Sequence, residues 1–187
     1  MNRTRLIITS LLIILCINAI SQNSNILTEL NGIKDVPYLP KSHGNCPDSI
    51  YWNLVKEGLG VIPDLIDCII STDSTQIPIP NWGGYYTIGD IAFAIICDII
   101  HGLPLQDFYS KGIISKENET YLTYHSFVCS SEGNRQILRH QLKKWFRKHR
   151  SELIWVKDDS EWKPPKNCKY IINRNPAGGY YMKNTYE

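Results

Sequence analysis

The stretch that follows Thr87 is apolar on almost every side, and a helix of that kind has to lie inside a folded domain. Its apolar residues recur at helical spacing: Ile91, Ala92, Ile95, Ile96, Ile99 and Ile100. Thr87 can cap such a helix, because Asp90 lies three positions further on, which is the spacing of a capping box. The sequence therefore predicts a central helix from Thr87 that other segments must cover.

A second, amphipathic helix is predicted directly upstream, ending near Ser71. Its apolar residues come in pairs every four positions: Val61, Ile62, Leu65, Ile66, Ile69 and Ile70. Pro63 falls in the first turn, where its missing N–H does no harm. We expect the two helices to share one buried contact, made by Ile62, Leu65, Ile66, Ile69, Ile95, Ile96 and Ile99.

Further helices are predicted on both sides of this pair. Asp48 can cap a helix that stops at Gly58, and the apolar spacing predicts others over residues 115–129 and 134–150. Residues 152–156 fit either a short strand or an extended tail. The fold class is thus mainly α, a small helical bundle.

The segment from Tyr51 to Ile100 resembles a HEAT-type helical repeat. The resemblance rests on the helix entry Gly60-Val61-Ile62-Pro63-Asp64-Leu65-Ile66, an acidic turn near Asp73 and the run Ile91-Ala92-Phe93-Ala94-Ile95-Ile96. It implies two helices packed antiparallel. The segment between them is several times longer than a HEAT turn, and no second copy recurs at a fixed period. The resemblance therefore implies one helix pair and not a solenoid.

Residues 72–86 are predicted to form a long loop, because Pro78, Pro80 and the pair Gly83-Gly84 interrupt any regular element. The part from Pro80 to Thr87 is similar to a loop of small secreted bacterial proteins, a resemblance that implies no activity. Structureless loops of this length are uncommon, and functional loops are over-represented among them.

The N-terminus has the features of a secretory signal. Arg3 and Arg5 precede an apolar run that ends in small residues near Ser21. We expect a signal peptide over residues 1–21, cleaved near Ser21, and a periplasmic or secreted location. Residues 22–45 are predicted to be an extended leader with room for one or two helical turns. Residues 46–187 are predicted to form a single helical domain with an irregular tail from about residue 157.

Cleavage removes two of the 20 Lys and Arg residues and none of the 18 Asp and Glu residues, so the mature chain has no net formal charge. This argues against nucleic acid as the partner, because phosphate binding needs a surplus of positive charge. No later segment is long and apolar enough to predict a transmembrane helix. An odd number of cysteines remains, which leaves the disulfide pairing open: Cys46, Cys68, Cys97, Cys129 and Cys168.

The motif Gly-Gly-Tyr-Tyr occurs twice, at residues 83–86 and 178–181. Paired glycines permit unusual backbone conformations, and adjacent tyrosines offer flat apolar faces with polar tips, a combination suited to a peptide or a sugar. The candidate binding residues are Trp82, Tyr85, Tyr86, Tyr180 and Tyr181. The alternative is that both loops cap the core with their aromatic rings turned inward.

Two Cys/His pairs have helical spacing, Cys97 with His101 and His125 with Cys129. Together they could ligate a metal, and either pair could supply a nucleophile. The alternative is that the cysteines lie in the core and that a histidine ends a helix. No hydrolase elbow, phosphate loop or zinc-protease motif is found. We therefore assign no catalytic residue, no metal ligand and no cofactor.

The helix over residues 134–150 is strongly basic and contains no acidic residue. Its charges suit an acidic protein partner or an anionic membrane, or simply a solvated face. The sequence as a whole predicts an exported, non-enzymatic interaction domain that binds a protein or peptidoglycan through its aromatic, glycine-rich loop. The alternatives are a periplasmic inhibitor or immunity protein, and a small hydrolase whose active-site residues are distant in sequence.

Overall fold

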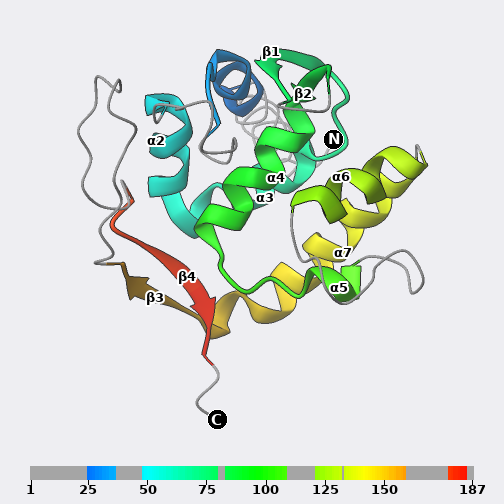
Figure 1. The fold of residues 1–187 in the computed structure, drawn as a ribbon. Coiled ribbons are helices and arrows are strands. Elements are labelled where there is room, and N and C mark those ends of the chain that lie inside the picture. The colour runs from blue at the N-terminus through cyan, green and yellow to red at the C-terminus, as the bar shows by residue number, and fades with distance from the viewer. Residues whose placement is uncertain are drawn as a thin grey trace, which may run out of the picture.

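The structure, a computed structural model, describes residues 25–36, 48–79, 83–108, 121–131, 133–158 and 177–184. The signal-peptide prediction for residues 1–21 lies outside these residues. The fold is mainly helical, with two small antiparallel sheets (Figure 1). Residues 25–32 are helical, and the later helices are α2 (Ser49–Glu57), α3 (Ile62–Cys68), α4 (Ile88–Ile99), α5 (Leu105–Phe108), α6 (Tyr121–Ser130) and α7 (Asn134–His149). The strands are β1 (Ser74–Pro78), β2 (Tyr85–Thr87), β3 (Leu153–Lys157) and β4 (Gly179–Lys183).

Helix α4 is the centre of the molecule, as its sequence predicts. All of its residues except Cys97 are buried. The expected capping box is present: the Thr87 hydroxyl accepts the N–H of Asp90 at 3.2 Å, and the Asp90 carboxylate accepts the N–H of Thr87 at 2.8 Å. The cap satisfies helix N–H groups that would otherwise be buried without a partner.

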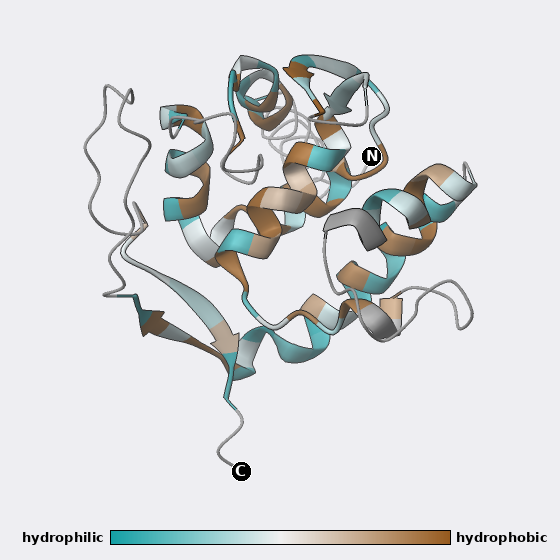
Figure 2. Ribbon diagram, in the orientation of Figure 1, coloured by the Kyte–Doolittle hydropathy of each residue, from teal (hydrophilic) through white to brown (hydrophobic). Residues whose placement is uncertain are grey.

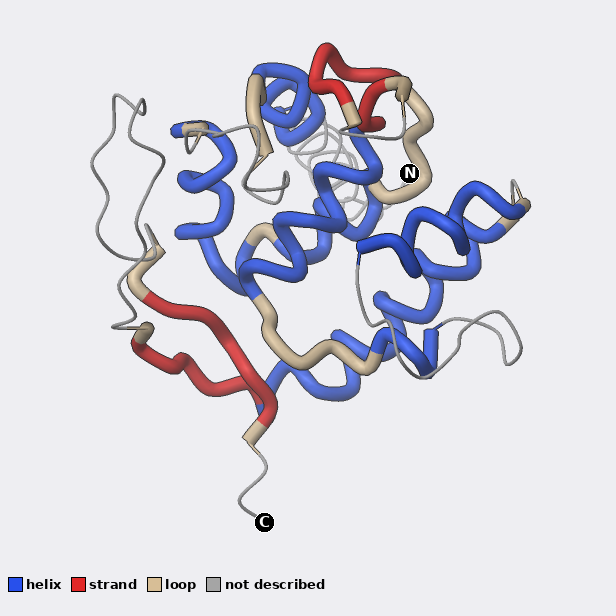
Figure 3. Tube along the Cα trace, in the orientation of Figure 1, coloured by secondary structure: helices blue, strands red, loops and turns tan. Residues whose placement is uncertain are grey.

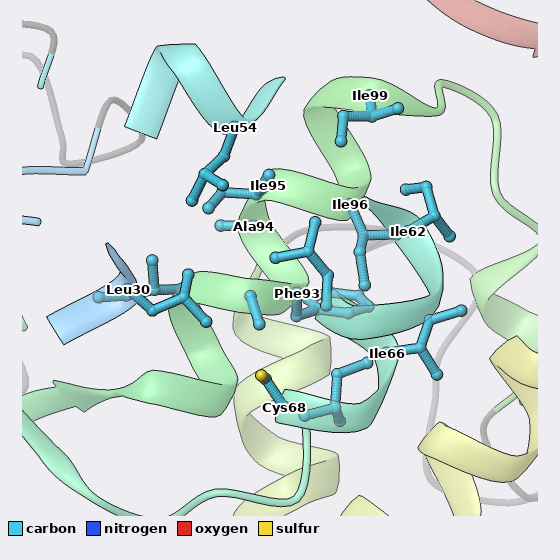
Figure 4. Close-up of a cluster of buried hydrophobic side chains, with 14 of the residues drawn as sticks. Leu30, Leu54, Ile62, Ile66, Cys68, Phe93, Ala94, Ile95, Ile96 and Ile99 are labelled. Atoms are coloured by element: carbon cyan, nitrogen blue, oxygen red, sulfur yellow. The ribbon is translucent and has the colours of Figure 1, made fainter. Parts of the chain in front are cut away.

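Helix α3 packs against α4, and the residues that were expected to make this contact are all buried. Figure 4 shows Ile62 and Ile66 of α3 beside Ile95 and Ile96 of α4, with Leu54 of α2 closing the cluster. The helical segment 25–32 adds Ile26 and Leu30, both buried, to the same core. That part of the predicted leader is therefore a docked helix.

A buried polar network joins α4 to α6 and α7. The Arg135 guanidinium lies 2.8 Å from the Asp90 carboxylate and donates to the Tyr124 hydroxyl and to the carbonyl of Ile69, each at 3.2 Å. The Tyr124 hydroxyl donates to Asp90 at 2.9 Å, and its ring stacks on Phe93. Each buried charge therefore has a partner, which is what makes such a pair tolerable inside a protein.

Two expectations about irregular structure are wrong. The predicted loop over residues 72–86 contains β1 and β2, which pair antiparallel with Ser74 opposite Thr87 and Pro78 opposite Tyr85. Strand β1 cannot be recognised from the sequence, because it is short and rich in turn-forming residues. Its buried and exposed positions nevertheless alternate, as in a regular strand. The predicted irregular tail contains β4, which pairs with β3 over five residue pairs. Residues 153–157 are thus a strand, one of the two alternatives left open.

Helix α7 begins and ends where its apolar spacing predicts. Among the described residues, no helix combines the length and apolar character that crossing a bilayer requires.

Candidate functional site

Both Gly-Gly-Tyr-Tyr motifs lie at the start of the returning strand of a hairpin. Gly83, Gly84 and Gly178 have positive φ angles of 74°, 77° and 78°, a region that side chains other than glycine rarely adopt. The hairpins lie on different sides of the molecule, β1–β2 beside the start of α4 and β3–β4 beside its end (Figure 3). The two motifs therefore do not form one surface.

In the first hairpin the two tyrosines have opposite environments. Tyr85 is 53% exposed, whereas Tyr86 is 5% exposed and belongs to the core. The Tyr86 carbonyl accepts the Thr75 hydroxyl at 2.7 Å, which holds β1 and β2 together inside the core. Trp82, the third candidate of this loop, lies outside the described residues. Tyr85 is thus the candidate of this hairpin that the structure places in solvent.

In the second hairpin both tyrosines are half-buried. Tyr180 stacks face to face on His101, with ring centroids 3.8 Å apart. Tyr181 packs so closely on Gly58 that a Cβ there would lie 3.0 Å from its ring, and its carbonyl accepts the His101 N–H at 2.8 Å. Burial lowers the pKa of His101, against the opposing charge of Asp158, which favours the neutral imidazole in the folded protein. These contacts fix β4 to the body of the protein.

The most exposed apolar side chains of the second hairpin belong to the opposite strand. In β3, Trp155 is 47% exposed and Ile154 is 42% exposed. The indole of Trp155 lies over Gly179, where an added Cβ would come within 2.5 Å of the ring, and it meets the Tyr181 ring edge-on at 5.0 Å. A glycine beneath and a tyrosine beside it hold this exposed indole in one position.

Sequence reasoning missed Trp155 and Ile154. The signal was the run Leu153-Ile154-Trp155-Val156, which places apolar residues on both faces of a short strand. A two-stranded sheet buries only one face against the core, so some of these side chains had to remain in solvent.

Positive charge surrounds the base of this hairpin. Lys183 lies 3.2 Å from Glu152, and the Arg150 guanidinium lies 5.7 Å from the centre of the Phe146 ring. Arg147 and Lys148, in the last turn of α7, are exposed, and no acidic side chain of the described residues pairs with them. Figure 2 shows the hydrophobic β3 beside the hydrophilic end of α7.

The first half of α7 is different, because its charges are used inside the molecule. Arg135 pairs with Asp90, and both Arg139 and Lys143 contact the carboxylate of Asp67 on α3. Although burial works to raise it, the hydrogen bonds from Lys143 and Arg139 hold the pKa of Asp67 below its ordinary value. The basic residues in the first half of α7 are therefore paired inside the molecule. Arg147 and Lys148, which pair with no acidic side chain of the described residues, lie at the end of the helix near the β3–β4 hairpin.

The Cys/His pairs do not assemble into a metal site. Within the part of the chain that the structure describes, no group of three or more His, Cys, Asp or Glu side chains could hold an ion. Burial raises the pKa of Cys97 to about 12. Cys68, Cys97 and Cys129 form no disulfide, and Cys46 and Cys168 lie outside the described residues.

One pocket of about 470 Å³ lies beside Cys129, between the α6–α7 turn and the segment after α3. The Cys129 sulfur is 3.7 Å from Nε2 of His125. Burial and the charge of Asp90 raise the pKa of Cys129, against the effect of Arg135. A nucleophilic cysteine is favoured by the reverse shift. The pocket is lined by Ile70, Thr72, Val128, Cys129, Ser131, Arg135 and Gln136.

Comparison of the chain with protein-family models, with curated proteins and with solved structures finds no match. We therefore infer the function from the geometry of the second hairpin.

Proposed function

We propose that the mature chain is an exported binding domain without enzymatic activity, a small helical bundle that contacts a protein partner through the β3–β4 hairpin. The observation that carries this proposal is the exposed indole of Trp155, held over Gly179 and against Tyr181. Tryptophan is among the residues that most often dominate the energy of protein interfaces. A side chain that is already fixed loses little conformational entropy on binding.

A protein partner fits this hairpin better than a sugar does. Ile154, the preceding residue, exposes a purely apolar side chain on the opposite face of β3. Sugar recognition needs polar groups to pair with the hydroxyls of the ligand, whereas the centre of a protein interface is apolar and aromatic. The exposed side chains of the hairpin are apolar and aromatic, like the centre of a protein interface.

An inhibitor or an immunity protein belongs to the same class of function, because each acts by covering the surface of another protein. A cysteine hydrolase that uses Cys129 is less well supported, since burial raises the pKa of that thiol, whereas a nucleophilic thiol needs a lowered pKa. The identity of the bound protein would distinguish an inhibitor or an immunity protein from another kind of binding domain.

The test is affinity capture from envelope extracts of the source organism with three forms of the protein. Trp155→Ala removes the indole, and Ile137→Ala serves as the matched control, because Ile137 is equally exposed at 45% but lies on α7. It is twelve residues before the end of that helix, or about 18 Å along its axis. We expect a protein that the wild type and Ile137→Ala retain and that Trp155→Ala loses, with binding weakened by about 2 kcal/mol or more.

Thermal unfolding accompanies the capture. Because Trp155 is half-exposed, Trp155→Ala should keep most of the stability of the wild type. If the folded Trp155→Ala variant captures the same proteins as the wild type, the hairpin is not the binding surface.

A further inference from the structure

Strand β3 has one edge to which no described strand is paired. Its other edge pairs with β4, and β4 in turn contacts Ile100 through an isolated bridge to Tyr181. Among the described residues, β3 is thus the outer strand of an open ribbon. An exposed edge of this kind is a template for a strand from another chain.

The hydrogen bonds at the two ends of the hairpin show which backbone groups face outward. The N–H of Asn184 donates to Glu152 at 3.0 Å, and the N–H of Asp158 donates to Gly178 at 3.1 Å. Because such pairs alternate along an antiparallel ladder, Ile154 and Val156 bond to β4. The intervening residues of β3 direct their backbone groups away from β4.

Three outward groups are therefore available near the middle of β3. The N–H of Leu153 is used, because it donates to the carbonyl of Arg150. The carbonyl of Leu153 and both backbone groups of Trp155 have no hydrogen-bond partner among the described residues. They present acceptor, donor and acceptor in sequence, at the point where the indole is exposed.

The charge around this edge selects the kind of strand that fits. Arg150 precedes β3, Lys157 ends it, and Lys183 lies opposite Leu153. Arg147 and Lys148 add two exposed charges on the preceding turn of helix. Among the residues of this region that the structure describes, Glu152 and Asp158 are the acidic ones. A net positive surface around an apolar strand attracts a negatively charged partner.

We propose that an extended acidic segment of a partner protein adds to β3 as a further strand. Its backbone bonds to the carbonyl of Leu153 and to Trp155, its apolar side chains cover the indole, and its carboxylates face Arg150 and Lys183. This inference rests on the proposed function and specifies its partner. A second copy of the chain fits less well, because it would bring the same positive charge to the edge.

The experiment uses a display library of random peptides about twelve residues long, enough to include a typical strand. The library is selected on the full-length mature protein and depleted on the Trp155→Ala variant. We expect the enriched peptides to carry net negative charge and to alternate apolar and other residues. Replacing Glu and Asp by Gln and Asn in an enriched peptide should weaken binding at least about tenfold. Added salt should also weaken binding, because it screens the charges.

Four further measurements complete the test. Amide hydrogen exchange with the peptide bound should protect the N–H of Trp155, and Ile137→Ala should bind the peptide as the wild type does. Vesicles with roughly one quarter phosphatidylserine in phosphatidylcholine test a membrane as the ligand, and sedimentation tests self-association.

The inference is overturned if the enriched peptides are neutral or basic, if none is enriched, or if the vesicles or a second copy occupy the hairpin instead. The proposed function is tested independently by the capture experiment. It fails if no protein is captured in a way that depends on Trp155. A captured protein that depends on Trp155 but lacks an acidic strand would retain the function and reject its mode of recognition.

Discussion

The two hairpins carry the same four residues, Gly-Gly-Tyr-Tyr, and use them in different ways. In β1–β2 the motif exposes Tyr85 and buries Tyr86. In β3–β4 both tyrosines are half-buried, and the exposed aromatic residue is Trp155 of the opposite strand. The motif therefore specifies a glycine turn followed by a strand, while the fate of each ring depends on what the strand lies against.

The cause of the difference is the element next to each strand. Strand β2 runs directly into α4, because its last residue, Thr87, is the cap of that helix. Tyr86 is thereby drawn into the core. Strand β4 lies between β3 and the segment after α4, so its tyrosines pack on Gly58 and His101 at the edge of the protein.

The largest expected effect separates the two tyrosines of the first hairpin. Tyr86→Ala should lower the free energy of unfolding by about 3–5 kcal/mol, since it removes a large buried aromatic ring. Tyr85→Ala should lower it by less than about 0.5 kcal/mol, as is usual for exposed positions. Denaturant unfolding of both variants measures the difference, and equal losses would mean that the rings are not divided between core and solvent.

A smaller effect is expected from the glycines of the two motifs. Gly179→Ala should cost about 1–3 kcal/mol, because the new methyl group meets both the Val156 carbonyl and the Trp155 indole. Gly84 has open space around it, so Gly84→Ala carries only the cost of a positive φ angle, about 1–2 kcal/mol.

Near-ultraviolet circular dichroism adds a second readout to this comparison. Gly179→Ala should change the aromatic signal by moving the indole, whereas Gly84→Ala should leave it unaltered. An unchanged spectrum for Gly179→Ala would show that the glycine does not position Trp155.

The smallest effect is a dependence of the second hairpin on pH. Burial lowers the pKa of His101 in the folded protein, so the folded state favours the neutral ring. The stabilisation is complete above the unfolded pKa of about 6.5 and is lost as the pH falls through the lower folded value. Acidification from pH 7 should therefore loosen the stack of His101 on Tyr180.

Amide exchange of β4 and of β2, followed between pH 7 and 5 and corrected for intrinsic rates, checks this expectation. His101→Phe keeps a stacked ring without a titrating group and should abolish the difference between the strands. A β4 that responds to pH equally in His101→Phe would assign the effect to another group.

Sequence reasoning succeeded where the determining residues are close together in the chain. The cap of α4 needs Thr87 and Asp90, three positions apart, and the contact of α3 with α4 follows from the spacing of isoleucines such as Ile66 and Ile96. Such local patterns can be recognised in the sequence without knowing the fold.

It failed where the partner is remote. Arg135 lies 45 residues from Asp90, and no local signal joins them. Strand β4 contains Gly179 and is recognisable only beside β3, whose residues come more than twenty positions earlier. The candidate surface was missed for the same reason, because Trp155 is exposed and rigid only when Gly179 and Tyr181 lie beside it.

The carboxylate of Asp90 has consequences for the order in which the protein folds. Its Oδ2 caps α4 through the neighbouring Thr87, but its Oδ1 is bonded by Tyr124 and Arg135, which are synthesised later. A nascent chain can therefore wind α4 early, yet burying its first turn would leave half of a charged group without compensation, a penalty of about 3–5 kcal/mol. We therefore expect the core to close only after Tyr124 and Arg135 have docked against Asp90.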